Sequence, residues 1–306
     1  MPSSTWPLRS LLFLPAHKID WVKKTALTAV DAVILDLEDS VPPARKQEAR
    51  SLIAEEIAIL RARGISVIVR TNSLDAGCEE DIAHVVCKGL TGIMLPKSND
   101  AGDIHRLHAL LDTAETAAAM DAGSVGILAL PETAKGLWLA YEIAAASPRV
   151  SGLITAISGP VSGDVSRAAG FEPTYEGSEQ LFLQSRIILA SRAAGAMYPI
   201  GTIMGTRLDD LEMVEKLARR GRRLGFAGAA LLHPSHVPIA NAVFRPSVEE
   251  VEYSKGLLQA MREAQARGDW AVSYRGAMVD AAMLPKTQEL IESDARYRAR
   301  EHNAQP

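Results

Sequence analysis

The chain has 306 residues, a net charge of −4 and a hydrophobic fraction of 47%. This composition is typical of a globular protein with a sizeable core and excludes a disordered or fibrous chain. Acidic residues (37) outnumber Lys and Arg (33), so no overall positive field draws the molecule to nucleic acid or to an anionic membrane.

Short apolar runs, most of them rich in the residues that strands favour, recur through the first three quarters of the chain. We expect strands over Leu11–Ala16, Ala32–Leu37, Ser66–Asn72, Thr91–Lys97, Val125–Glu132, Gly152–Ser158, Met197–Met204 and Gly228–Pro234. The segments between them are long enough for helices, such as Pro43–Arg63, Asp100–Met120, Gly136–Ala146, Ser178–Ala194 and Asp209–Leu224. Runs such as AVILDL and VGILAL are apolar on both faces, as the strands of a parallel sheet are.

This repetition predicts an α/β fold, a (β/α)8 TIM barrel, whose usual length of about 250 residues fits the chain. The rival fold, a doubly wound sheet with a dinucleotide site, needs a G-x-G-x-x-G motif, and GPVSGD at 159–164 has the wrong spacing. We place the barrel at residues 1–235. Residues 236–306 are expected to form a C-terminal helical extension that acts as a lid or an oligomer contact.

The sequence also predicts a cellular compartment. No apolar stretch approaches the ~20 residues needed to cross a bilayer. The two cysteines, Cys78 and Cys87, are too few for a metal framework and fit free thiols in a reducing environment. We therefore expect a cytoplasmic protein that contacts neither membrane nor nucleic acid.

Charged residues gather where the predicted strands end, which is where a barrel of this type builds its active site. Asp36, Glu38, Arg70 and Glu132 end strands, and Asp164 lies in the loop after the sixth. Ordinary alternatives exist: Arg70 can simply pair with a neighbouring carboxylate, and an Asp in the Gly-rich stretch around 164 often only shapes a turn. Glu132 ends a strongly apolar strand, where a charge needs a partner or a metal.

Carboxylates from separate strands, without His or Cys, favour a hard cation such as Mg²⁺ over zinc. Such a cation keeps open positions for a 2-oxo or 2-hydroxy acid and polarises the bound oxygen as a Lewis acid. Arg70 is suited to stabilise a second developing oxyanion or to hold a carboxylate. Covalent catalysis through a Schiff base is the weaker hypothesis, with Lys97 as its strand-end candidate.

The strand-end residues lie within longer motifs. These include RSLLFLPA from Arg9, DLEDSVPPARKQEAR over Asp36–Arg50, VRTN from Val69, LPK from Leu95, LPETAKG from Leu130, SGDVSRAAG from Ser162, RLGFAGAALLHPSHV from Arg223, NAVFRPS from Asn241 and RGAMVD from Arg275. In these motifs the chain resembles the citrate lyase β-subunit-like acyl-CoA lyases of the HpcH/HpaI aldolase superfamily. DLEDSV with its trailing KxxAR is the most specific element, and the resemblance covers nearly the whole chain.

The resemblance implies a Mg²⁺-dependent carbon–carbon lyase. Its substrate would be a 3-hydroxyacyl-CoA acid such as citramalyl-, malyl- or citryl-CoA, cleaved to an acyl-CoA and a 2-oxo acid. Glu132 and Asp164 would hold the metal, with the substrate chelated through its hydroxyl and carboxylate. Arg70 would bind the thioester or carboxylate oxygen and stabilise the enolate of the leaving acyl-CoA.

The resemblance assigns roles to four further residues. Asp36 and Glu38 match an acidic pair near the metal waters, and Lys24 lies where similar proteins carry a lysine near the CoA phosphates. Asp280 matches an aspartate that a neighbouring subunit donates, and we take it as the first candidate for the catalytic base, with Asp36 second. The enzyme would then be a homo-oligomer, commonly a trimer or hexamer.

Other functions remain open at this point. They are a malyl-CoA thioesterase, a malate-synthase-like activity, an aldolase of free 4-hydroxy-2-oxo acids, and a non-catalytic subunit of a larger complex. The long C-terminal segment through Asp280 favours the CoA substrate over the free acid. The chain departs from the family pattern at Ala16, Gly201 and Ala229, and at Arg275, where the usual residue is Asp before Gly276.

Overall fold

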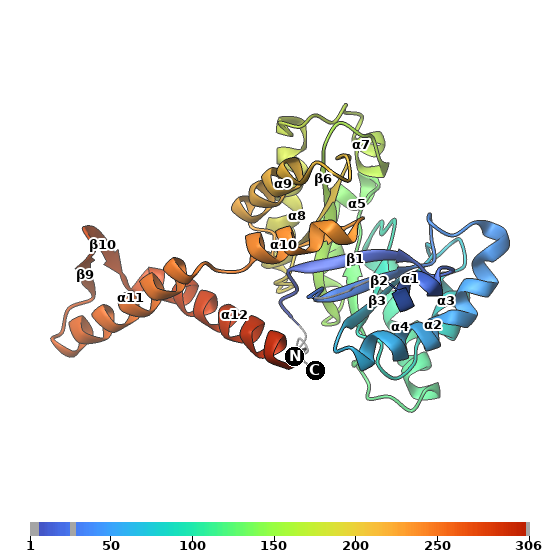
Figure 1. The fold of residues 1–306 in the computed structure, drawn as a ribbon, viewed down its shortest axis with the longest axis horizontal. Coiled ribbons are helices and arrows are strands. Elements are labelled where there is room, and N and C mark those ends of the chain that lie inside the picture. The colour runs from blue at the N-terminus through green and yellow to red at the C-terminus, as the bar shows by residue number, and fades with distance from the viewer. Residues whose placement is uncertain (1–5, 25–28, 304–306) are drawn as a thin grey trace. The chain divides into compact units, whose positions relative to one another are not determined.

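The computed structural model describes residues 6–24 and 29–303. Within these residues the predicted strands close into a barrel of eight parallel strands in chain order (Figure 1). They are β1 (Ser10–Pro15), β2 (Ala32–Asp36), β3 (Ser66–Arg70), β4 (Gly92–Leu95), β5 (Gly126–Ala129), β6 (Val150–Ser158), β7 (Ile200–Met204) and β8 (Gly228–Leu231). Since β8 pairs with β1, the sheet has no free edge. The predicted TIM barrel is confirmed.

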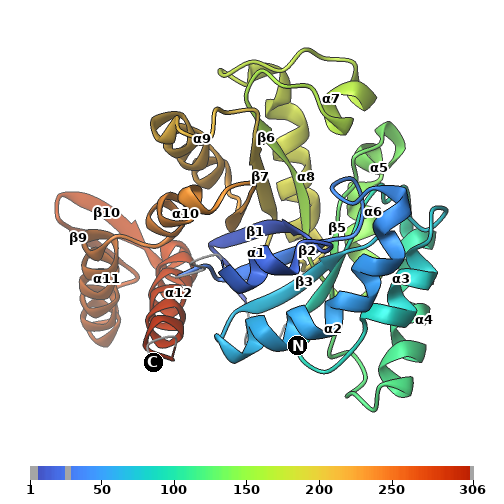
Figure 2. The same ribbon diagram turned by 45° about the vertical axis from the view of Figure 1, so that its right-hand side comes forward.

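Helices cover the outside of the barrel. They are α1 (Ile19–Lys24), α2 (Lys46–Ala62), α3 (Cys78–Val85), α4 (Ala101–Ala117), α5 (Ala134–Trp138), α6 (Ala140–Ala145), α7 (Asp164–Ala169), α8 (Leu181–Ala193), α9 (Leu211–Leu224) and α10 (Val237–Phe244). Short 3-10 turns are η1 (Pro43–Arg45), η2 (Ser178–Gln180) and η3 (Pro234–His236). Figure 2 shows α2, α3 and α4 along one flank of the barrel and α8 and α9 along another.

Two apolar cores explain why the strands are apolar on both faces. Inside the barrel, alternate strand residues such as Ile34, Ile68 and Leu128 pack together. Their neighbours along the strands, such as Leu35 and Val69, face outward into a larger core that includes buried residues of the helices. The alternation decides which strand-end residues point into the barrel.

The chain divides into two compact units, with the first ending at Phe244 and the second starting at Arg245. The sequence placed this boundary at residue 235. The structure groups α10 with the barrel because α10 packs against α9, β1 and β8.

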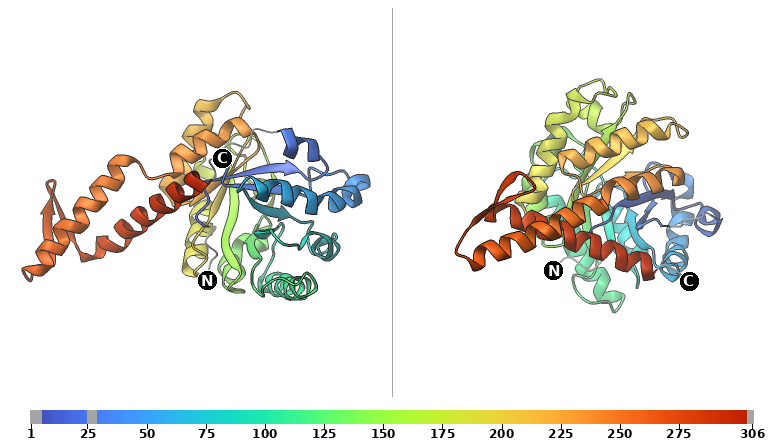
Figure 3. Two further views of the ribbon diagram at one scale, coloured as in Figure 1. Left: turned by 60° about the horizontal axis from the view of Figure 1, so that its bottom comes forward. Right: turned by 60° about the vertical axis from the view of Figure 1, so that its left-hand side comes forward.

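The second unit pairs two long helices and a hairpin. Its elements are α11 (Val248–Ala266), β9 (Ala271–Tyr274), β10 (Ala277–Asp280), η4 (Ala281–Met283) and α12 (Leu284–Asn303). Figure 3 shows α11 and α12 running side by side, with the antiparallel β9–β10 hairpin at one end of the pair. The two helices agree with the helical extension expected from the sequence, whereas the hairpin was not expected.

The turn of this hairpin contains Arg275, which stands where the family pattern usually has Asp. Arg275 and Gly276 have φ angles of 48° and 83°, the pattern of a two-residue type I′ turn. The Arg275 guanidinium lies over the rings of Tyr253 and Tyr274, at 5.7 and 5.6 Å from their centres. These contacts compensate for an unusual residue in a left-handed position.

Among residues 6–24 and 29–303, no helix combines the length and apolar character needed to cross a bilayer.

Candidate active site

The last inward-facing positions of β2 and β3 are occupied by two charged residues. Asp36 follows Ile34 by two residues and Arg70 follows Ile68 by two, so both point toward the barrel interior. The two residues are directly paired across the strands. Arg70 donates from Nε to Asp36 Oδ1 at 2.6 Å and from Nη2 to Asp36 Oδ2 at 2.7 Å. This fork is the strongest geometry for an arginine and a carboxylate.

Asp36 also anchors the loop that follows β2. Its two oxygens accept the backbone N–H groups of Glu38 at 2.9 Å and Ser40 at 3.1 Å. Burial raises the pKa of Asp36, but the bonds from Arg70 and from the loop outweigh burial and hold the pKa below its usual value. The contacts therefore favour the anionic form of Asp36, which holds the guanidinium. This makes it a poor base, which disfavours its second-choice role as proton acceptor.

Glu38 lies beside the same guanidinium and holds a lysine from the end of β4. Glu38 Oε2 is 3.2 Å from Arg70 Nη1, and Glu38 Oε1 is 2.5 Å from Lys97 Nζ. Burial lowers the pKa of Lys97, but the Glu38 carboxylate more than offsets this and raises it. A Schiff base requires the neutral amine. The ion pair therefore disfavours the hypothesis of Lys97 as a covalent nucleophile.

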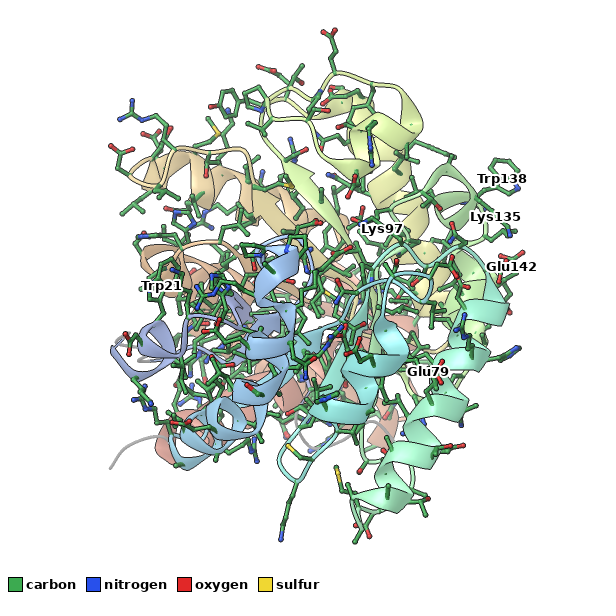
Figure 4. All side chains as sticks on the ribbon, turned by 90° about the vertical axis from the view of Figure 1, so that its right-hand side faces the viewer. Trp21, Glu79, Lys97, Lys135, Trp138 and Glu142 are labelled. Atoms are coloured by element: carbon green, nitrogen blue, oxygen red, sulfur yellow. The ribbon has the colours of Figure 1, made fainter. Side chains whose placement is uncertain are left out.

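The backbone of Lys97 is as informative as its side chain. Its φ of 51° is left-handed, which is uncommon for a residue other than glycine. The Lys97 N–H donates to Glu132 Oε1 at 3.1 Å. Lys97 thus contacts Glu38 with its ammonium group and Glu132 with its backbone. Figure 4 shows Lys97 between Trp21 on one side of the view and Trp138 on the other.

Glu132 stands two residues beyond the buried Leu130, just after β5. Burial raises the pKa of Glu132 to about 7, and the negative charges of Glu38 and Asp164 contribute to the rise. Lys97 and Arg70 act in the opposite direction and favour the charged form of Glu132.

Asp164 is the first residue of α7. It forms an ion pair with Arg167, one turn later on the same helix. Asp164 lines the same cavity as Glu132, and its charge acts on the Glu132 carboxyl. It therefore begins a helix and faces the cavity rather than merely shaping a turn.

Asp36, Arg70, Glu132 and Asp164 line one cavity of about 410 Å³. Its charged lining is Asp36, Asp39, Arg70, Glu132 and Asp164. Its apolar lining includes Phe13, Trp21, Leu130, Val165, Phe171, Leu183, Met204 and Leu232. The cavity can hold a ligand with a charged end and an uncharged remainder, as ligand pockets commonly do.

Two glutamines in the cavity wall were missed by the sequence reasoning. Gln180 Oε1 accepts the N–H of Ser158 at 3.1 Å, and Gln180 Nε2 donates to the Ser158 carbonyl at 3.0 Å. Gln184 Nε2 donates to the Ala156 carbonyl at 3.0 Å and to Gln180 Oε1 at 3.1 Å. Both fix the end of β6. Their signal was two polar residues four apart, on a face of a predicted helix that is otherwise apolar.

The other two predicted site residues, Asp280 and Lys24, belong to β10 and α1. Asp280 ends β10 in the second unit, where its exposed carboxylate accepts the N–H of Ala282 at 2.9 Å. Lys24 is the last residue of α1, and its side chain lies outside the described part of the chain. The residues that line the cavity belong to the barrel unit.

The donor set fits Mg²⁺. In the part of the chain that the structure describes, no group of three or more His, Cys, Asp or Glu side chains is arranged to hold a metal. Two carboxylates with several waters are enough for Mg²⁺. Glu38 Oε2 is buried and accepts no hydrogen bond among the described residues, although Arg70 Nη1 lies 3.2 Å away as an ion-pair partner, so it could accept a hydrogen bond from water beside a cation. Burial, together with the charges of Glu38 and Asp164, raises the pKa of Glu132, and a cation bound beside it would favour its charged form.

The family model of the HpcH/HpaI aldolase/citrate lyase family matches residues 9–234, which include every strand of the barrel. The chain belongs to this family. Within it, a citrate lyase subunit beta-like protein of Deinococcus radiodurans is 32% identical over 292 residues, covering 94% of this chain and 98% of the relative. An L-malyl-CoA/beta-methylmalyl-CoA lyase of Cereibacter sphaeroides is 32% identical over 306 residues, covering 95% of each chain.

One solved structure that is similar to this chain carries ligands. It is the protein CitE from Mycobacterium tuberculosis in complex with magnesium, acetoacetate and coenzyme A. It shares 28% sequence identity with this chain and has a TM-score of 0.67, covering 94% of this chain and 97% of that one. The resemblance seen in the sequence is thus confirmed at the level of the family.

Proposed function

We propose that the protein is a Mg²⁺-dependent carbon–carbon lyase of 3-hydroxyacyl-CoA acids such as malyl-, citramalyl- or citryl-CoA. The observation that carries this proposal is the position of Arg70, held as a fork by Asp36, in the same cavity as Glu132 and Asp164. Arg70 is a cation held in place, and Glu132 and Asp164 are a pair of acidic side chains. A substrate with an oxyanion at one end and a chelating hydroxy acid at the other matches both.

The proposed reaction is a retro-Claisen cleavage. The hydroxyl proton passes to a base, and the oxygen electron pair forms the carbonyl of the 2-oxo acid. The carbon–carbon bond breaks, and its electrons pass to the thioester as an enolate, which then takes a proton on carbon. Arg70 is the residue placed to stabilise the enolate oxygen, and an oriented cationic donor of this kind contributes a factor of roughly 10²–10³ in rate.

Glu132 and Asp164 are proposed to hold the cation. Mg²⁺ bound there would supply Lewis-acid polarisation of the substrate hydroxyl and carboxylate oxygens. The Lys97 N–H orients Glu132 through its bond to Oε1, and the Lys97 ammonium orients Glu38. Such outer contacts commonly fix a metal ligand before the metal arrives.

The base is proposed to be Asp280, supplied by the C-terminal unit of a neighbouring copy, and Lys24 is proposed to meet the CoA phosphates. An exposed carboxylate at the end of a hairpin can reach another molecule, which supports this role. The enzyme would then be a homo-oligomer, a trimer or hexamer as in similar proteins. The proposed compartment is the cytoplasm, supported by the two free thiols Cys78 and Cys87.

The test is turnover of purified protein on malyl-, citramalyl- and citryl-CoA, with Mg²⁺ and after chelation. Free 2-oxo acid and free thiol are followed separately. Release of 2-oxo acid without thiol, dependent on Mg²⁺, is expected. Release of thiol would instead show a thioesterase or malate-synthase-like activity, and turnover of a free 4-hydroxy-2-oxo acid would show an aldolase without CoA. Turnover that survives chelation would overturn the metal assignment.

A further inference from the structure

Lys46 occupies an unusual place in the most specific motif of the chain. It is the first residue of α2, and a positive charge near a helix N-terminus is electrostatically unfavourable. Its ammonium nevertheless has three acceptors. Lys46 Nζ donates to the carbonyl of Leu37 at 2.8 Å, to the carbonyl of Glu38 at 3.1 Å, and to Asn72 Oδ1. The three donors of the ammonium are thus all engaged.

Asn72 is itself held rigidly on the far side. Its backbone N–H and its Nδ2 both donate to Asp81 Oδ2, at 2.6 and 2.8 Å. Asp81 is fully buried, and its Oδ1 accepts from Arg50 Nε at 2.7 Å. Lys46 and Arg50 are the K and R of the trailing KxxAR. A buried chain of polar contacts therefore runs from Arg50 through Asp81 and Asn72 to Lys46.

These polar contacts end at the loop that follows β2, which carries Glu38 and binds Asp36. Lys46 binds the carbonyl groups of Leu37 and Glu38, the two residues directly after Asp36. The Glu38 carbonyl also accepts the N–H of Val41 at 3.2 Å. The Glu38 side chain that leaves this backbone meets Arg70 and Lys97. Moving the loop would move Glu38 and the N–H groups that hold Asp36, and with them the Arg70 fork.

We propose that Lys46 is a positioning residue, which fixes the loop at residues 37–41 so that Asp36 and Glu38 hold Arg70 in its reactive orientation. This inference rests on the proposed lyase function. The acceptors of the Lys46 ammonium are two backbone carbonyls and a side-chain amide, and none of them is a carboxylate. The role of Lys46 is therefore to order the backbone rather than to neutralise a negative charge. Displacing a reacting group by about 1 Å can cost roughly 10²-fold in rate.

The experiment compares Lys46→Met with Lys46→Arg and with Arg63→Met. The control is matched: Arg63 follows the other end of α2 and also donates to two backbone carbonyls, of Val22 at 3.0 Å and Lys23 at 3.1 Å. Hydrogen exchange of the amides of 38, 40 and 41 measures the loop without reference to activity. Turnover of the CoA esters and calorimetric Mg²⁺ binding complete the measurements.

Lys46→Met is expected to lose amide protection at the loop and to lower kcat by ~10- to 100-fold, with Mg²⁺ affinity reduced less than kcat, because Lys46 contacts neither Glu132 nor Asp164. Lys46→Arg should recover part of the amide protection and part of the kcat. Arg63→Met should change neither the amide protection of the loop nor kcat. Unchanged protection and kcat in Lys46→Met would overturn the inference. So would a loss of kcat with protection intact. If the unsubstituted protein turns over none of the esters, the lyase proposal fails, while the exchange data still decide whether Lys46 orders the loop.

Discussion

Arg70 and Asp36 are bound to each other by two parallel hydrogen bonds from paired positions on adjacent strands. A similar fork joins Arg9 and Asp31 at the other end of the same barrel, with bonds of 3.0 and 2.8 Å. These two ion pairs have similar geometry, but the Arg70–Asp36 pair lines the cavity, whereas both side chains of the Arg9–Asp31 pair are 2% exposed or less. Comparing variants of Arg70 and Arg9 can therefore distinguish a proposed role in catalysis from a role in stability.

Arg70→Lys should lower kcat by ~10²-fold or more, because a lysine cannot reproduce the fork and directs its charge to a single point. Arg9→Lys is the matched control. It should lower the melting temperature and leave kcat unchanged, since Arg9 lies at the amino end of the strands. Steady-state kinetics and thermal unfolding of both variants give the comparison. Equal loss of kcat in the two would show that Arg70 only supports the fold.

Glu132→Gln should abolish Mg²⁺ binding measured by calorimetry in the absence of substrate, because an amide is a much weaker ligand for a hard cation. The control is Glu142→Gln, which changes an exposed glutamate on α6 (Figure 4). That variant should bind Mg²⁺ as the unsubstituted protein does. Retained Mg²⁺ binding in Glu132→Gln would remove the residue from the metal site.

Asp280→Asn should lower kcat by ~10²-fold while leaving Mg²⁺ binding intact, because the base acts on the substrate and not on the cation. The trans assignment has a sharper test. Arg70→Ala and Asp280→Asn are each expected to have strongly reduced activity, and mixing them under conditions of subunit exchange should raise the activity above that of either variant, at sites that combine both intact residues. Failure to recover activity in exchanged oligomers would place Asp280 within its own subunit or outside the reaction.

Glu56→Gln should change the pH dependence of stability. Glu56 is fully buried on α2, and neither carboxyl oxygen has a hydrogen-bond partner among the described residues. Burial raises the pKa of Glu56 to about 8, from an ordinary value of 4.5. Between these values the folded state retains a proton that the unfolded state has lost. The free energy of unfolding therefore falls as pH rises through this window, by at most about 1.4 kcal/mol per pH unit.

Denaturant unfolding between pH 5 and pH 9 measures this effect. Glu56→Gln should flatten the curve and stabilise the protein at the alkaline end, where the unsubstituted carboxyl must ionise in an apolar site. Glu79→Gln, at an exposed position on α3, should leave the slope unchanged. A slope that is the same in all three proteins would show that Glu56 is hydrated or paired in solution.

The barrel and part of its site could be predicted from the sequence because both follow from local pattern. Apolar runs of strand length define the barrel, and alternation carries Asp36, Arg70 and Glu132 to its interior. The support around them could not be predicted in this way. The contact of Lys46 with Asn72, and that of Lys97 with Glu38, join residues 26 and 59 positions apart. Such contacts depend on the register between strands and on loop conformation, which periodicity does not report.

Other differences have their own physical reasons. The hairpin after α11 escaped notice because β9 and β10 have four residues each and expose most of their side chains. Short, exposed strands carry little hydrophobic signal. The boundary moved to Phe244 because α10 buries Val237, Ala240 and Val243 against the barrel unit, a contact that the change in sequence pattern at Pro234 did not reveal.

The left-handed backbone at Lys97 has a consequence for anyone who wishes to engineer this enzyme. Asparagine or glycine would adopt this conformation at lower cost, so a search for thermostable variants would tend to replace the lysine. Such a variant would lose the ammonium that holds Glu38 while it kept the backbone N–H that holds Glu132. Increased heat resistance would then come with reduced turnover, and position 97 would mark where selection for catalysis has accepted a less stable protein.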